Sequence, residues 1–170
     1  SEVSKIVRVI PYVEDRKNCL LVSPVIQLTA SQLYSLQAAL KQAILQQYQL
    51  EDSELATEAL PSSGTPHNLL FYEAAEGGAG VLHQIVEDPA VIPALARRAL
   101  KICHFDEQGN DLGAQHQPEP CVAACYDCLM SYSNQYVHKE LDRRGIRDLL
   151  LTLTQSSVQA CAPVLGRAKQ

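Results

Sequence analysis

Three cysteines lie within the eight-residue segment CVAACYDC, which runs from Cys121 to Cys128. Their spacing, Cys-x3-Cys-x2-Cys, suits a tight metal knuckle in which a short loop wraps around one ion. Cys103 precedes this segment across a polar loop and supplies a fourth thiol. Structural zinc sites hold the ion with four such ligands at about 2.3 Å and leave no position open. The sequence therefore predicts a structural zinc site built from Cys103, Cys121, Cys125 and Cys128.

Other ligand sets satisfy the same pattern. His104, beside the first cysteine, and His116, in the polar loop, could each replace Cys103 in a site of three cysteines and one histidine. An iron–sulfur cluster also takes four cysteine ligands, and the spacing does not separate it from zinc. Four buried free thiols are a further alternative, but thiols clustered so closely are prone to oxidation.

A polar and basic run follows the knuckle. Four thiolates around a divalent ion leave a net negative charge, which nearby donors must offset. The run also supplies candidate contacts to nucleic acid or to a protein partner, namely Asn134, Gln135, His138, Lys139, Arg143, Arg144 and Arg147. A solvated helix face is the competing interpretation, because Glu140 and Arg144 have the spacing of an ordinary i, i+4 pair.

The composition narrows the class of protein. A net charge of −5 is opposite to that of an autonomous nucleic-acid binder, so any DNA contact is expected to be local. No apolar run approaches the roughly 18 residues of a membrane span, and the segment SEVSKIVRVI lacks the regions of a signal peptide. We therefore expect a cytoplasmic protein without membrane contact, whose clustered cysteines bind metal rather than form disulfides. Cys19 and Cys161, outside the cluster, are interpreted as packed or idle thiols.

The elements that must position these residues follow from the spacing of apolar side chains. KIVRVIPYV and CLLVSP predict two strands that form a hairpin around a polar turn at Asp15 to Asn18. The period then changes to that of a helix beginning at Thr29, where Thr29 and Gln32 fit a capping box. Its apolar face, which we expect to pack on the hairpin, consists of Leu33, Leu36, Leu40, Ile44 and Tyr48.

Further strands and helices follow. DSELATEAL and NLLFYEA predict two strands, VLHQIVEDP predicts a short helix, and VIPALARRALKI predicts a helix with Cys103 at its end. HKELDRRGIRDLLLTL predicts the last helix. The glycines of EGGAG are interpreted as a tight turn, because no Gly-Lys-Ser/Thr follows to complete a nucleotide loop. We therefore expect no ATP hydrolysis by this chain alone.

Together these elements predict a single domain over residues 1–170, with its core at about 3–155 and a tail at 156–170. The predicted class is α/β of the α+β kind. A small, mostly antiparallel sheet packs with several helices, and a zinc knuckle of four cysteines joins two of the helices.

The quoted segments also carry a resemblance to a known family. CYDCLMSYSNQYVHKELDRR, preceded by FYEAAEGGAG and VEDRKNCLLV, resembles the zinc-binding C-terminal domain, or MZB domain, of Mrf-type DNA-repair helicases. The resemblance runs from about Val13 to Leu153, and its most specific part is the knuckle with the downstream Asn-Gln, His and Leu-Asp-Arg. It implies that Cys103, Cys121, Cys125 and Cys128 are the zinc ligands.

The resemblance also implies a setting. Such domains occur at the C-terminus of superfamily 2 DEAD/DEAH-type helicases and in helicase-like components of bacterial anti-phage systems of the DISARM and Druantia kinds. The loop after Cys103 is longer than the compact Cys-x-Cys start of the repair helicases, which favours a defence or otherwise divergent member.

The resemblance and the residues together predict a non-catalytic, zinc-stabilised module. Its expected partners are the helicase motor domains of the same or a partner polypeptide, which it braces, and DNA, which it contacts weakly or indirectly. The alternative is a protein-interaction module of a defence or repair complex that makes no contact with nucleic acid. A metal-dependent hydrolase is disfavoured, because four thiolates would fill the coordination shell that a reactive water needs.

Overall fold

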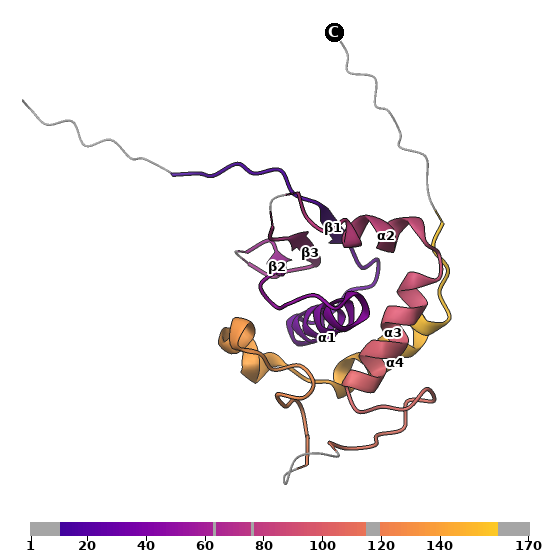
Figure 1. The fold of residues 1–170 in the computed structure, drawn as a ribbon. Helices are drawn as coiled ribbons and strands as arrows, with labels where there is room; N and C mark the ends of the chain where they lie inside the picture. The colour runs from indigo at the N-terminus through magenta and orange to yellow at the C-terminus, as the bar shows by residue number, and fades with distance from the viewer. Residues whose placement is uncertain (1–10, 63, 76, 115–119, 160–170) are drawn as a thin grey trace, which may run out of the picture.

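A three-stranded antiparallel sheet and one long helix form the centre of the protein (Figure 1). The structure, a computed structural model, describes residues 11–62, 64–75, 77–114 and 120–159. Its elements in chain order are β1 (Cys19–Val22), α1 (Ala30–Tyr48), β2 (Leu55–Leu60), β3 (Asn68–Glu73), α2 (Val81–Glu87), α3 (Val91–Ile102), the 3-10 helices η1 (Tyr132–Glu140) and η2 (Arg144–Ile146), and α4 (Arg147–Thr154). The predicted α/β class with a small antiparallel sheet is confirmed.

The strands are arranged in the order β1-β3-β2. β3 is the central strand, and its alternate residues Leu69 and Phe71 are fully buried. The expected hairpin is only partly present. Its second strand is β1, but β1 pairs with β3, and residues 11–18 contain no strand. The remainder of the expected first strand lies outside the described residues.

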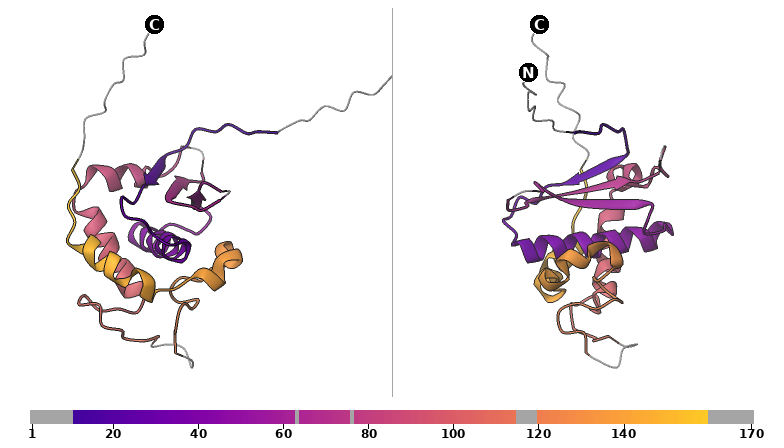
Figure 2. Two further views of the ribbon diagram at one scale, coloured as in Figure 1. Left: turned by 180° about the vertical axis from the view of Figure 1, so that it is seen from behind. Right: turned by 90° about the vertical axis from the view of Figure 1, so that its left-hand side faces the viewer.

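α1 packs against one side of the sheet and lies between it and the C-terminal part of the chain (Figure 2). The predicted capping box is confirmed, since the Thr29 hydroxyl accepts from the Gln32 amide at 3.2 Å and the Gln32 side chain accepts from the Thr29 amide at 3.0 Å. Leu33, Ala39 and Ile44 are buried along its length. The sheet therefore packs on one side of α1, and α3 and the 3-10 helices η1 and η2 also pack against this helix.

α3 and α4 pack side by side, and α3 also packs against α1 (Figure 1). The expected continuous helix from His138 to Leu153 is wrong, because the chain runs through two 3-10 segments before α4 begins at Arg147. The reason lies in tertiary hydrogen bonds. The Asp142 amide donates to the Ser35 hydroxyl at 2.8 Å, and the Arg143 amide donates to the Ala123 carbonyl at 2.8 Å. Because these two amides donate to other segments, they cannot make the i to i−4 hydrogen bonds of a continuous helix.

The glycine run between β3 and α2 encloses a buried carboxylate. Glu73 accepts hydrogen bonds from the amides of Gly80 at 2.9 Å and Leu82 at 3.0 Å, and from the Asn18 side chain at 3.1 Å. Gly78 has a φ of +55°, and a Cβ there would overlap the Glu73 carboxylate. The interpretation of the glycines as a tight turn agrees with the positive φ of Gly77, Gly78 and Gly80, and the close packing is found at Gly78 alone among the three. Among the described residues, none of the helices combines the length and apolarity needed to cross a membrane.

Candidate metal centre

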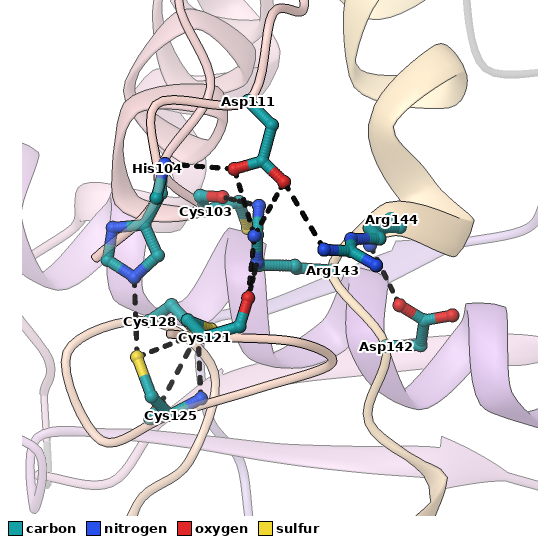
Figure 3. A network of polar contacts seen from close by, with 10 residues as sticks. Cys103, His104, Asp111, Cys121, Cys125, Cys128, Asp142, Arg143 and Arg144 are labelled. Atoms are coloured by element: carbon teal, nitrogen blue, oxygen red, sulfur yellow. Dashed lines mark hydrogen bonds and ion pairs between the residues drawn. The ribbon is translucent and has the colours of Figure 1, made fainter. Parts of the chain in front are cut away.

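Three cysteines and one histidine converge at the end of α3 (Figure 3). The ligand atoms of His104, Cys121, Cys125 and Cys128, called here the metal group, all lie within 4.8 Å of one another. The Sγ atom of Cys128 is 3.7 Å from that of Cys121 and 3.5 Å from that of Cys125. His104 Nε2 lies 3.3 Å from Cys125 Sγ.

These distances fit a tetrahedral zinc ion. Zinc–sulfur bonds of about 2.3 Å at tetrahedral angles separate two sulfur atoms by about 3.8 Å. A disulfide, by contrast, requires about 2.0 Å between sulfur atoms, and the cysteines of the group are free thiols. The three cysteines are buried, and the histidine is half-buried. The donor set and its spacing are therefore those of a structural zinc site.

The knuckle is shaped by its own backbone. The Cys128 amide and the Met130 amide both donate to the Cys125 carbonyl, at 3.1 and 3.0 Å. In return the Cys125 amide donates to Cys128 Sγ at 3.1 Å. A hydrogen bond of this kind stabilises negative charge on a ligating sulfur. The turn therefore brings its thiols together, and it gives the Cys128 sulfur a hydrogen bond that favours the thiolate form that binds metal.

His104 reaches the group because α3 ends in a Schellman motif. The His104 amide donates to the Lys101 carbonyl at 3.0 Å, and the Phe105 amide donates to the Leu100 carbonyl at 2.9 Å. His104 occupies the left-handed position of this motif with a φ of +62°, where glycine is usual. A non-glycine residue at this position carries a backbone cost, which is typical of functional sites.

Cys103 is buried beside the metal group but is not one of its four members. Burial raises the pKa of its thiol to about 12, against the opposing effect of the Arg143 charge. Its carbonyl oxygen accepts from Arg143 Nη1 at 3.1 Å. The structure thus groups His104 with the three knuckle cysteines, as in the alternative of three cysteines and one histidine, and leaves Cys103 out of that group. The other histidine alternative, His116, lies outside the described residues, as does Cys161.

The protonation states of the group suit metal binding. Burial raises the pKa of the Cys121 and Cys128 thiols, so both are neutral until a metal displaces their protons. Burial and the Arg143 charge lower the pKa of His104, which keeps its imidazole in the neutral form that a metal binds. Metal binding should therefore release protons from the Cys121 and Cys128 thiols and none from the His104 imidazole.

Arg143 is the polar centre beside the site, with its guanidinium between Asp111 and Cys121 (Figure 3). It is 1% exposed, and it donates to the Cys121 carbonyl through Nη2 at 2.7 Å and Nε at 3.1 Å. Nη1 holds the Cys103 carbonyl, and Nη2 also holds both oxygens of Asp111 at 2.9 and 2.8 Å. The guanidinium stacks over the Phe105 ring at 5.0 Å. Its positive charge lies close to the cysteines, where it can offset the negative charge that thiolate ligands would carry.

This position corrects the expectation that Arg143 contacts nucleic acid or a partner. Its donors are directed to the carbonyls of Cys103 and Cys121 and to the Asp111 carboxylate, and its own side chain is buried. The sequence grouped Arg143 with Arg144 and Arg147 because the three lie close together in one basic run. The structure separates them, since Arg144 and Arg147 have exposed side chains. Arg144 lies 3.6 Å from Asp111, and Arg147 pairs with Asp148 at 2.8 Å.

Two more candidate contacts hold the segment that follows the knuckle. Asn134 donates to the Leu129 carbonyl at 2.8 Å and accepts from the Ser131 amide at 2.8 Å. His138 Nε2 lies 3.0 Å from the Ser131 carbonyl, and its ring meets the Tyr126 ring edge-on. Both side chains are half-buried. Gln135 and Lys139 are exposed, and with Arg144 and Arg147 they stay predicted contacts.

A group of three thiols and one imidazole, enclosed between α3 and a cysteine knuckle in a small α/β fold, defines a zinc-binding module. The family profile described as the MrfA Zn-binding domain matches residues 36–129, which is more than half of the chain and includes all four members of the metal group. The chain belongs to this family. No curated protein and no solved structure shows a match to it.

Proposed function

We propose that this chain is a non-catalytic, zinc-stabilised accessory domain of a DNA helicase or helicase-like defence protein. It braces the motor and assists its engagement of DNA. The observation that carries the proposal is the match to the MrfA Zn-binding domain over a segment that contains the whole metal group. The zinc ligands in this proposal are His104, Cys121, Cys125 and Cys128.

The proposed bracing role is supported by what the metal group connects. His104 comes from the end of α3, and the cysteines come from a loop that begins beyond a long polar segment. Zinc, when bound, supplies a cross-link between these two parts. Such a link removes much of the entropy cost of ordering the loop. Arg143 extends the connection to the segment before α4 by holding the carbonyls of Cys103 and Cys121.

The donor set supports a structural rather than a catalytic role. Four protein ligands complete a tetrahedral shell, whereas a catalytic zinc keeps one position for water or substrate. A zinc-bound module of this kind suits the reducing cytoplasm, where thiols are not consumed by disulfides. An iron–sulfur cluster is the alternative occupant, and an absorbance spectrum with elemental analysis distinguishes the two.

The motor-bracing proposal can be tested with a helicase motor from the same family that lacks its own zinc-binding domain. The zinc-loaded chain should raise the DNA-stimulated ATPase rate of that motor when added in trans. The chain stripped of metal by a chelator should not, because its knuckle is no longer fixed. If the zinc-loaded chain leaves both the ATPase rate and the DNA affinity of the motor unchanged, the proposal is contradicted.

A second candidate is a protein-interaction module without contact to nucleic acid. It is favoured by exposed apolar side chains in and after the knuckle, namely Val122 (60%), Tyr126 (66%), Tyr132 (87%) and Tyr136 (78%). Exposed tyrosines of this kind are enriched at protein interfaces. A titration with DNA at several salt concentrations separates the candidates, because phosphate contacts must weaken as salt rises.

A further inference from the structure

The helix that ends at the metal group carries three cations on one face. Arg97, Arg98 and Lys101 fall within one third of the circumference of α3, because residues three and four apart share a helix face. In the part of the chain that the structure describes, none of the three forms an ion pair with a carboxylate. Arg16 and Lys139 share this property, but they come from separate parts of the chain.

Neutral acceptors hold the two arginines in place. Arg98 Nε donates to Gln47 Oε1 at 3.0 Å, and Arg97 Nη1 donates to the Thr154 carbonyl at 3.4 Å. A guanidinium has five N–H donors, so most of the donors on each arginine remain available. The two arginine side chains are thus partly ordered in advance without a carboxylate partner in the described structure, and this ordering lowers the entropy cost of binding an anion.

These cations line two surface hollows, called together the α3 groove. The hollows have volumes of about 440 and 480 Å³ and share Arg98, Lys101 and Leu112. One hollow extends to His104 of the metal group, and the other extends along α3 to Arg97. Leu112 is 54% exposed and offers an apolar surface between the cations.

Three carboxylates, as many as the cations, also line the two hollows, but none of them forms an ion pair with a cation of the groove. The Asp106 carboxylate is occupied by its own loop, where it accepts from the amides of Gln108 at 2.9 Å and Asn110 at 2.8 Å. Glu107 lines one hollow and Asp127 the other, and both are exposed. Neither pairs with a cation of the groove.

We propose that the α3 groove binds the sugar–phosphate backbone of a nucleic acid strand. This inference rests on the proposed function and locates its DNA contact. Guanidinium groups match phosphate oxygens in geometry and charge, and a nearby ammonium adds a point charge. An exposed apolar side chain between them suits the less polar face of a sugar or base.

The metal group is coupled to the groove through one turn. The Leu112 amide donates to the His104 carbonyl at 2.8 Å, so the residue that supplies the imidazole also fixes one wall of the groove. Metal bound at His104 would hold that wall in place. The proposal therefore expects nucleic-acid affinity to fall when zinc is removed.

The test uses the full 170-residue chain loaded with zinc. Fluorescence anisotropy measures its binding to a labelled oligothymidylate and to a labelled duplex over a series of salt concentrations. The test variant is Arg97→Gln/Arg98→Gln/Lys101→Gln. A charge-preserving variant, Arg97→Lys/Arg98→Lys/Lys101→Arg, controls for packing. The matched control, Lys5→Gln/Arg8→Gln/Arg16→Gln, removes the same charge from the N-terminal part of the chain, where none of the candidate contacts lies.

The test variant should bind at least about tenfold more weakly, and its salt slope should fall by roughly 2 to 3 units, because each phosphate contact contributes about 0.7 to 0.9. The charge-preserving variant and the matched control should keep most of the wild-type affinity and slope. If the test variant binds like the wild type, the α3 groove is overturned while DNA engagement stands.

If the wild type binds neither nucleic acid, the DNA role in the proposed function fails, and the α3 groove fails with it. The same labelled chain is then titrated with polyglutamate. Binding that is lost in the test variant would assign the groove to an acidic protein segment and would overturn the nucleic-acid proposal.

Discussion

The guanidinium of Arg143 holds the carbonyl oxygen of Cys121 through two of its nitrogens, at 2.7 and 3.1 Å, across 22 residues of sequence. This places a permanent positive charge directly behind the first cysteine of the knuckle. The same side chain holds the Cys103 carbonyl, so one residue fixes the spacing between the end of α3 and the start of the knuckle. The metal group depends on that spacing.

Replacing Arg143 should therefore damage both stability and metal binding. Arg143→Ala should lower the free energy of unfolding by about 3 kcal/mol, since it leaves buried carbonyls without donors. Arg143→Lys should lower zinc affinity by about 10- to 100-fold, because one ammonium cannot reproduce the planar set of contacts. Denaturant titration and competition with a chromophoric chelator measure the two effects.

The neighbouring Arg144 provides the control. Its side chain is 55% exposed and lies 3.6 Å from Asp111, so Arg144→Ala should change stability by less than about 0.5 kcal/mol. Wild-type zinc affinity in Arg143→Lys would show that the carbonyl contacts do not shape the site.

His104 and Cys103 should respond differently to substitution. His104→Ala removes a member of the metal group and should reduce the zinc retained after dialysis against a chelator to well below one equivalent. Cys103→Ala removes a buried thiol outside the group and should retain full zinc, with a stability loss on the order of 1 kcal/mol. Metal content measured on both purified variants decides whether His104 or Cys103 is the fourth ligand. The reverse pattern would restore the set of four cysteines.

Glu73 should make stability depend on acid. Burial raises the pKa of its carboxyl, but the hydrogen bonds from Leu82, Asn18 and Gly80 outweigh burial and hold the pKa below its ordinary value. A group with a lowered folded pKa stabilises the protein fully above its unfolded pKa of about 4.3 and loses that contribution as pH falls through the folded value. Stability should therefore decrease between about pH 5 and the folded pKa.

Glu73→Gln isolates this contribution from any acid release of metal. The variant should be less stable than the wild type at pH 7, because its amide offers one acceptor where the carboxylate offers two. The difference between the two proteins should shrink as the pH is lowered through the window. Urea titrations at a series of pH values measure it. A difference that stays constant with pH would exclude Glu73 as the titrating group.

Two glycines of the same turn offer a matched pair. Gly78 and Gly80 both have positive φ, +55° and +73°, but only Gly78 has the Glu73 carboxylate where a Cβ would lie. Gly80→Ala should cost about 1 kcal/mol of stability from backbone strain alone. Gly78→Ala should cost about 1 to 3 kcal/mol more, because it also displaces Glu73. Equal losses would show that the carboxylate moves aside freely.

Local features of the fold follow from the sequence, whereas long-range ones do not. The capping box of α1 involves only Thr29 and Gln32, so its residues specify it directly. The partner of β1 is β3, some fifty residues away, and no local pattern identifies it. The last helix fails to extend as expected because Asp142 and Arg143 donate their amides to distant segments.

The candidate site shows the same division. Spacing alone identifies Cys121, Cys125 and Cys128, because a short turn must bring them together. It cannot choose between the adjacent Cys103 and His104, since that choice depends on the left-handed turn that ends α3. The role of Arg143 is hidden for a similar reason. Its acceptors lie 22, 32 and 40 residues away in the sequence.

The central claim is that one zinc ion is held by His104 and three cysteines. X-ray absorption at the zinc edge, with elemental analysis of the purified full chain, tests it most directly. We predict one equivalent of zinc with three sulfur neighbours at about 2.3 Å and one nitrogen neighbour at about 2.0 Å. A shell of four sulfur atoms, bound iron, or a folded chain without metal would contradict the account.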